Sequence, residues 1–307
     1  MITVAQDAKA PSGGTGKQTR WFAKIVPWFW IAPALVFVLV LLVYPVLNTI
    51  WTSLFNNDST VFVGLKNYGT IFTDPAMLEV LKNNLLWLVL GTVGTVTLGL
   101  VIAVLVDRVR IESFVKATIF VPMALSFVAA GVIWKFVFEY AAQGQSQIGL
   151  LNAIISGFGG QPQAWLINSP LNNLALIAVY IWMWTGFCMV ILSAALKGVP
   201  VEIMEAARMD GASELAIFFR IIIPLISPTI AVVATTMVIN LLKIFDIVYV
   251  MTGGFEGTNV VALKYYEEYF IFNHFGRASA LAVLLLVVII PVMIVNLRRF
   301  RVQEAQR

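Results

Sequence analysis

Six long apolar runs constrain the fold of this chain more than any other feature of its sequence. An α-helix needs about 20 apolar residues to cross about 30 Å of hydrocarbon. The runs occupy residues 28–50, 83–106, 117–138, 174–196, 221–242 and 278–297. With 60% hydrophobic and 12% charged residues, the chain is also far from the composition of a soluble domain. We therefore predict an all-α membrane protein with six transmembrane helices.

Polar segments flank the apolar runs at both ends of the chain. Residues 1–27 are rich in Gly, Ser and Thr and are predicted to form a flexible cytoplasmic tail. The predicted transmembrane domain covers residues 28–297, and residues 298–307 form a second short cytoplasmic tail.

Basic residues predict the orientation of the chain, because Lys and Arg gather on the cytoplasmic side of membrane proteins. Most of the 20 basic residues lie in the two tails and in the loops after the second and fourth runs: Lys9, Lys17, Arg20, Lys24, Arg108, Arg110, Lys116, Lys197, Arg208, Arg220, Arg298, Arg299, Arg301 and Arg307. An even number of spans places both termini on one side. We therefore expect both termini and the loop at residues 197–224 to be cytoplasmic.

The segment 197–224 is almost the only charged stretch between the long apolar runs. Pro200 fits the first turn of a helix, and Glu202 suits the positive end of that helix. Gly211 permits a break before a second short helix that ends near Pro224. The pattern predicts a helix, a turn and a second helix.

A motif within this segment resembles the EAA loop of ATP-binding-cassette importer permeases. Its positions are Glu205, Ala206, Ala207, Asp210, Gly211, Ile221 and Pro224. The resemblance implies a type I importer permease fold in which this loop forms a coupling helix that docks into a groove on a cytoplasmic ATPase subunit. The residue types suit that role, since alanines permit close approach, the glycine permits a sharp turn, and Glu205 can pair with a basic group. The family's usual Leu before the proline is Ile223 here.

Two further elements resemble sugar-importing members of this family. Residues 62–68 are similar to the FxGLxNY element, and residues 243–254 are similar to the FDxVYVMTGG element of carbohydrate-type permeases. The segment 257–306 looks closest to permeases for α-glucosides. The expected Pro after the double glycine is absent, because residues 255–257 read Phe-Glu-Gly.

Polar residues near the end of the fifth run are candidates for the substrate path. Asn240, Lys243 and Asp246 recur at a spacing of three, which places them on one face of a helix. A charged group deep in a bilayer costs about 3 kcal/mol, so such groups pair or line a wet path. The alternative is that Lys243 and Asp246 lie near the outer headgroups, and whether they pair is left open.

Aromatic residues in the fourth run are a second group of candidates for the path. They are Tyr180, Trp182 and Trp184. Sugars present an apolar C–H face that packs on aromatic rings, while their hydroxyls need polar partners. Trp and Tyr are also ordinary anchors at membrane interfaces, which is the alternative interpretation.

Glycines have two different expected roles in this chain. Gly91, Gly94 and Gly99 in the second run predict close packing of helices. The Gly-rich segment 139–173 is predicted to be an outward loop, and it is a candidate contact for an external binding protein.

Enzyme chemistry has no support in the sequence. One Cys and one His give no basis for a disulfide or a zinc site, and we expect no catalytic residue, metal or cofactor in this chain. Residues 13–19 read GGTGKQT and depart from the phosphate-binding loop, since Pro11 replaces its first Gly and Gln18 follows Lys17. ATP and Mg²⁺ are therefore expected on a partner. Most basic residues lie in the tails and loops that are predicted to be cytoplasmic, as expected for a membrane protein, so they give no reason to expect a nucleic-acid partner.

The resemblance implies a permease subunit of an ATP-driven, binding-protein-dependent sugar importer in the bacterial inner membrane. Its expected partners are a second permease subunit, often a different chain, two ATP-binding subunits, an extracytoplasmic sugar-binding protein and the lipid bilayer. Substrate would cross by alternating access. Two alternatives are an ATP-independent secondary transporter and a membrane scaffold that recruits a cytoplasmic partner.

Overall fold

The computed structural model describes residues 18–107, 109–142 and 144–305. These residues form helices, turns and loops with no strand, and an isolated bridge joins Phe55 to Phe62. The chain divides into two units, residues 1–51 and 52–307. The all-α fold predicted from the sequence is confirmed over the described part of the chain.

The first unit consists of one long apolar helical segment. It comprises α1 (Gln18–Val38), a π-helical turn (Leu39–Val43) and α2 (Tyr44–Thr52), which reaches one residue into the second unit. The first predicted run lies within it. Helix α1 begins before residue 28, so the last part of the predicted tail is helical, and residues 1–17 of that tail lie outside the described residues.

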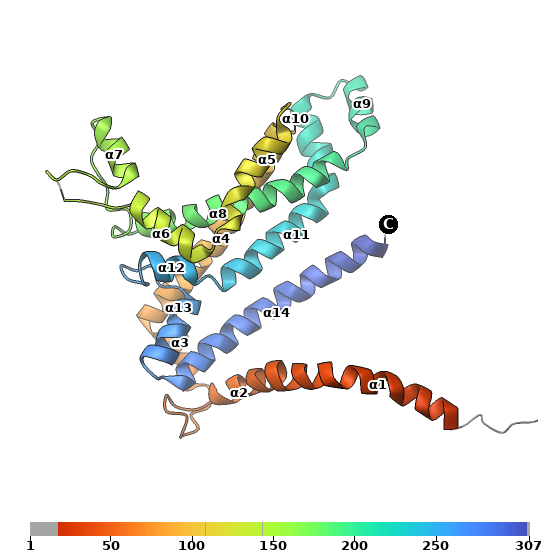
Figure 1. Cartoon of the computed structure of the whole chain (residues 1–307), viewed down its shortest axis with the longest axis vertical. Coiled ribbons are helices and arrows are strands. Elements are labelled where there is room, and N and C mark those ends of the chain that lie inside the picture. Colours follow the sequence, from red (N-terminus) through yellow and green to blue (C-terminus); the bar gives the residue numbers. More distant parts are fainter. Residues whose placement is uncertain (1–17, 108, 143, 306–307) are drawn as a thin grey trace, which may run out of the picture. The chain divides into compact units, whose positions relative to one another are not determined.

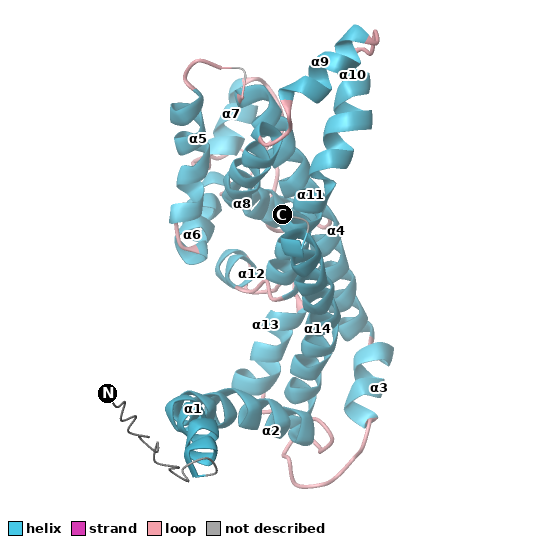
Figure 2. Cartoon of the chain, turned by 90° about the vertical axis from the view of Figure 1, so that its right-hand side faces the viewer, coloured by secondary structure: helices cyan, strands magenta, loops and turns pink. Residues whose placement is uncertain are grey.

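The second unit is built on four long helices, α4 (Pro75–Val106), α8 (Leu171–Lys197), α11 (Ile223–Leu242) and α14 (Phe275–Ala305) (Figures 1 and 2). Shorter helices and helical turns connect them: α3 (Lys66–Thr73), α5 (Glu112–Phe120), η2 (Val121–Ala124), α6 (Phe127–Val137), α7 (Leu150–Gly157), α9 (Val201–Met209), α10 (Glu214–Ile217), η3 (Phe218–Ile222), α12 (Asp246–Met251), α13 (Val261–Tyr266) and η4 (Glu267–Ile271). Helices α10 and α12 lie at opposite ends of α11, and we call the α12 end the distal end.

Five described helices are long and apolar enough to cross a membrane, and a bent pair makes six if it counts as one span. The bent pair is the third predicted run. Residues Glu112–Ala124 and Phe127–Val137 meet at 99°. The bend has a local cause, because Pro122 lies in a 3₁₀ turn and the Ser126 hydroxyl accepts a hydrogen bond from the Ala129 N–H at 3.1 Å, which starts a new helix.

The remaining differences from the sequence prediction lie at the ends of the runs and between them. Helix α14 continues to Ala305, so the predicted C-terminal tail is helical as far as the structure describes it. The two predicted outward loops contain the short helices α3 and α7. Both helices have 8 residues, which is too short to cross a membrane.

Close packing of α4 against α8 and α11 depends on glycine. A Cβ atom on Gly99 would lie 2.5 Å from the Cys188 Cβ, and one on Gly94 would lie 2.4 Å from a methyl carbon of Ile181. A Cβ on Gly91 would lie 2.9 Å from a leucine methyl of α11. The predicted packing role of these glycines is confirmed.

The core of the second unit lies along α8, from its distal half to its last turns. Leu176, Tyr180, Met189 and Leu192 are fully buried there. Side chains of α4, α6, α11 and α12 pack around the first two, and those of α4 and α11 pack around the others. Helix α8 is thus the central element for α4, α6, α11 and α12, whereas α3, α13 and α14 pack with the start of α4 in a separate cluster.

We predict that Gly99→Ala destabilises the protein by about 1–3 kcal/mol, because the added methyl group overpacks the contact with α8. The measurement is thermal unfolding of the purified chain in detergent. Gly69→Ala is the matched control, since Gly69 lies in α3 with open space around it, and alanine there is expected to be neutral or stabilising. Equal stability of the Gly99→Ala variant and the wild type would contradict the packing role.

Candidate coupling loop and transport path

The segment between α8 and α11 folds as the sequence predicts at its first helix and its turn. Helix α9 begins at Val201 directly after Pro200, and Glu202 lies in its first turn. Gly211 has a φ of +81°, in the left-handed region that favours glycine. The Gly211 N–H donates to the Arg208 carbonyl at 3.0 Å, which closes the turn.

The predicted end of the second helix near Pro224 is wrong. Residues Glu214–Leu242 run without interruption through α10, η3 and α11. Pro224 is tolerated because it occupies the first turn of α11, where the π-helical register pairs the Ile223 N–H with the Phe218 carbonyl five residues back. The loop is therefore joined to a membrane-crossing helix without a break.

The motif residues lie on an exposed surface around α9 and the turn. Glu205, Ala206, Asp210 and Gly211 are exposed, and Ala207 is buried. Ile221 is half-buried and Pro224 exposed in the helix that follows. The structure thus brings five motif positions together in the loop and sets the last two into the helix beyond it.

Apolar side chains are exposed beside these motif residues. Met209 is 88% exposed and Leu215 is 71% exposed. Across the turn that joins α9 to α10, the Arg208 Nε donates to Glu214 Oε1 at 2.7 Å. This hydrogen bond and the charge of Glu214 raise the pKa of the Arg208 guanidinium, which keeps the turn bridged by an ion pair. Exposed apolar side chains on a braced turn are typical of a surface that contacts another protein.

The aromatic candidates of α8 divide into two groups. Tyr180 is fully buried, its ring stacks on Trp184 with centroids 6.1 Å apart, and its hydroxyl donates to the Met237 sulfur of α11 at 3.9 Å. Trp182 points elsewhere, packs edge-on against Trp134 at 5.4 Å, and lines a separate, mainly apolar cavity of about 570 Å³. The two-residue offset places Trp182 on a different side of the helix.

The spacing argument for the three polar candidates is wrong. Helix α11 ends at Leu242, and α12 begins at Asp246, so Asn240, Lys243 and Asp246 do not share one helix face. Lys243 is exposed, Asp246 is half-buried, and no ion pair joins these two described residues. Asn240 is half-buried in the last turn of α11, three residues after Met237.

A buried indole donor lies beside each of the two aromatic groups, Trp87 beside Tyr180 and Trp134 beside Trp182. Among the described residues, the indole N–H of Trp87 and that of Trp134 are buried with no hydrogen-bond partner. Trp87 packs edge-on against Tyr180 with centroids 6.1 Å apart. An unpaired buried donor costs free energy, so an acceptor that reached either indole N–H would be stabilised there.

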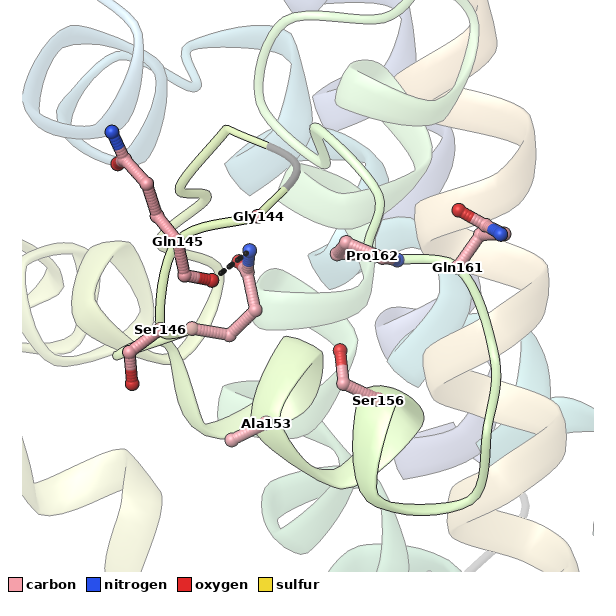
Figure 3. A pocket seen from close by; sticks show the side chains of 8 residues that line it. Gly144, Gln145, Ser146, Ala153, Ser156, Gln161 and Pro162 are labelled. Atoms are coloured by element: carbon pink, nitrogen blue, oxygen red, sulfur yellow. Dashed lines mark hydrogen bonds between the residues drawn. The ribbon is translucent and has the colours of Figure 1, made fainter.

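The Gly-rich segment at the distal end contains a polar cleft of about 610 Å³ (Figure 3). Gln145, Ser146, Ser156 and Gln161 lie around it, and α7 forms one wall (Figure 3). Buried Asn152 holds the segment in place. Its side-chain amide donates to the Gln163 carbonyl at 3.0 Å, and its side-chain oxygen accepts from the Gln163 N–H at 2.9 Å. It is an organised polar surface.

Comparison with known proteins identifies the family. Residues 95–299 match the family described as the inner membrane component of binding-protein-dependent transport systems. The chain belongs to this family. The permease is therefore a multi-pass membrane protein, and the resemblance found in the sequence is confirmed.

Relatives cover nearly the whole permease. It is 56% identical to the osmoprotective compounds uptake permease protein GgtC of Synechocystis sp., over 91% of this chain and 100% of the relative. It is 46% identical to the alpha-glucoside transport system permease protein AglF of Rhizobium meliloti, over 89% of this chain and 82% of the relative. A chain of a bacterial alginate transporter, solved with a periplasmic protein that binds an alginate pentasaccharide, has the same fold. Its TM-score is 0.76 at 19% identity, with 91% of this chain and 96% of that chain covered.

One charge cluster of the permease was not predicted. Lys197, at the end of α8, contacts Glu112 at 2.6 Å and Asp107 at 3.5 Å, and Lys116 bonds both Glu112 and Ser193. The cluster ties the ends of α4 and α8 to the start of α5, directly before the α9 loop. The four-residue spacing of Glu112 and Lys116 was the available signal, but their partners are distant in sequence.

A second missed feature is a set of buried asparagines at the distal end. Asn83 and Asn173 donate to the Gly257 carbonyl at 2.8 and 3.0 Å. Asn172 donates to the Glu256 carbonyl at 2.6 Å, and Asn84 accepts from the Val261 N–H at 2.7 Å. Two adjacent asparagine pairs, at the starts of α4 and α8, thus fix the loop after α12.

We predict that Asn84→Ala destabilises the permease by about 1–3 kcal/mol, because the buried Val261 N–H loses its acceptor. The measurement is thermal unfolding of the purified chain in detergent. Asn168→Ala is the control, since Asn168 is exposed just before α8. Similar unfolding of the two variants would contradict the proposed importance of this bond.

Proposed function

We propose that this chain is a permease subunit of an ATP-driven, binding-protein-dependent sugar importer that works by alternating access. The observation that carries the proposal is the exposed α9 loop, which continues directly into the membrane-crossing segment Glu214–Leu242. A force applied to α9 by a partner would reach the bundle through a turn of four residues that the Arg208–Glu214 ion pair braces. This arrangement suits a subunit driven from outside its own fold.

The proposed assembly contains a second permease subunit, two ATP-binding subunits and an extracytoplasmic sugar-binding protein. ATP and Mg²⁺ bind the ATP-binding subunits, which hydrolyse the ATP. The α9 loop and both termini face the cytoplasm, and the distal end faces the binding protein. The charge cluster around Lys197 and Glu112 supports this scheme, because it fixes α4 and α5 to α8 where the loop begins. Motion of α9 would then move these helices together.

Sugar is the substrate class that the described path supports best. The half-buried Trp184 offers aromatic surface, and the unpaired indole N–H of Trp87, beside Tyr180, can donate to a hydroxyl oxygen. The name of one relative supports this class, since AglF is an alpha-glucoside transport system permease protein. A neutral oligosaccharide or α-glucoside is the proposed cargo.

The coupling role predicts that Glu205→Ala and Gly211→Asp lower binding-protein-stimulated ATP hydrolysis by the reconstituted complex. Gly211→Asp places a side chain at a φ of +81°, and it adds a charge to the docking surface. The measurement is stimulated ATPase activity with co-purification of the ATPase subunit. Glu202→Ala, on the same exposed helix but outside the motif, is expected to behave like the wild type. Full stimulation in both motif variants would favour a solitary secondary transporter or a scaffold.

The path predicts a separate effect for Trp184→Ala and Asn240→Ala. Each should reduce the maximal uptake rate about tenfold in proteoliposomes, because a stacking face or a hydrogen bond is lost, while the ATPase subunit still co-purifies. Val190→Ala, exposed on α8, is the control. Wild-type rates and wild-type sugar preference in both path variants would remove these residues from the path.

A further inference from the structure

A second cavity lies at the distal end, between the end of α6, residues 164–167 and the turn that follows α12. Its volume is about 270 Å³. It is lined by Lys135, Phe138, Glu139, Tyr140, Ala164, Leu166, Ile167, Met251, Thr252 and Glu256. This volume is near the lower end of the roughly 300–1,000 Å³ of small-molecule sites, so it suits one monosaccharide unit.

Four polar side chains of this cavity are unused by the fold. Within the described ranges, the side chains of Lys135, Glu139, Tyr140 and Glu256 form no hydrogen bond with one another or with their neighbours, and no ion pair joins the lysine to either glutamate. The cavity therefore offers two carboxylates, an ammonium and a phenol to a ligand. Opposite charges that share a cavity without pairing are available to hydroxyl groups, which both donate and accept.

The same cavity has an apolar wall. Phe138 is 5% exposed and Met251 is 3% exposed, and both belong to the core cluster that contains Tyr180. The cavity is thus continuous in packing with the aromatic group of the proposed path. Apolar carbon on one side and convergent polar groups on the other are the two requirements of a carbohydrate site.

Glu256 is fixed at the cavity by its backbone. Asn172 donates to its carbonyl at 2.6 Å, and the next carbonyl, that of Gly257, accepts from Asn83 and Asn173. Glu256 has a φ of +55°, a left-handed conformation that costs about 1 kcal/mol or more for a residue with a side chain. The buried asparagines hold the backbone at Glu256, and its exposed side chain extends from that fixed position at the rim of the cavity.

We propose that this cavity is a subsite for one hydroxyl-rich sugar unit, which the cargo contacts before it reaches the aromatic path. Glu139 and Glu256 accept hydrogen bonds from neighbouring hydroxyls, Lys135 donates to a ring or hydroxyl oxygen, and Phe138 lies against the C–H face. The inference rests on the proposed importer function and adds a specificity-determining contact to it.

The test uses the complete reconstituted complex with its binding protein saturated by maltose in one series and trehalose in another. At saturation, the sugar affinity of the binding protein no longer limits uptake, so the ratio of the two maximal rates reports on the permease. Glu139→Gln and Glu256→Gln keep the shape of the side chain and remove its charge. Asp58→Asn is the matched control, because Asp58 is an exposed carboxylate in the loop before α3.

We expect each glutamine variant to lower the maximal uptake rate about tenfold and to change the maltose-to-trehalose ratio, because a charge-assisted hydrogen bond is weakened. ATP hydrolysis stimulated by the sugar-free binding protein should stay at the wild-type level, as should every rate of Asp58→Asn. If a glutamine variant fails to assemble, Lys135→Gln, at an exposed position, is expected to give the same pattern.

Wild-type uptake rates and ratios in the glutamine variants, or in Lys135→Gln, would overturn the subsite. A parallel fall in uptake and in sugar-free stimulated ATP hydrolysis would also overturn it, because the cavity would then be a docking contact for the binding protein. Absence of uptake of both sugars by the wild-type complex would contradict the proposed α-glucoside cargo, and with it the subsite that rests on that cargo. The two failures are therefore distinguishable.

Discussion

The approach of α4 to α8 is the contact on which the rest of the second unit depends. At Gly99 a Cβ atom would lie 2.9 Å from the backbone nitrogen of Met189, and at Gly94 the Ile181 side chain packs directly against the glycine, so the two helices lie closer than any larger residue would permit. In lipid, where burial of apolar surface contributes little between helices, this contact supplies dispersion energy that a looser pair would lack. Because α4 and α8 are held together, the asparagines near their distal ends lie within hydrogen-bond distance of the Glu256 and Gly257 carbonyls. At the other end, Lys197 lies within ion-pair distance of Asp107 and Glu112.

Much of this architecture could be predicted from the sequence, because its signals are local. Apolar runs of membrane-spanning length, a proline after a glycine at the end of α8, and Gly211 at the turn each act through their own neighbours in the chain. The exposure of Glu205 and the turn at Gly211 followed from the same local reasoning. The fifth apolar run ends at residue 242, where α11 ends. The three-residue spacing of Asn240, Lys243 and Asp246 nevertheless indicates one continuous helix face, and that spacing does not reveal that the backbone leaves the helix at Lys243.

The features that sequence reasoning missed are contacts between distant segments. Asn83 and Gly257 are 174 residues apart, and Lys116 and Ser193 are 77 apart. An asparagine in a membrane helix predicts that a partner exists, but the partner becomes known only when the helices are packed. The same holds for the division of Tyr180 and Trp182 between two sides of α8, since periodicity separates them without saying what each side faces.

The uninterrupted helical segment Glu214–Leu242 has a mechanical consequence. At 1.5 Å per residue, its 29 residues form a rod about 43 Å long, against about 30 Å of hydrocarbon. Such a rod acts as a lever, because a tilt of about 10° at one end displaces the other by about 7 Å, as the helical rise and length dictate. The chain leaves the rod at Lys243, where the backbone can absorb the displacement as a change of angle. In the proposed mechanism, a small tilt of this helix imposed by an ATP-binding subunit would therefore produce a displacement about as wide as a sugar ring.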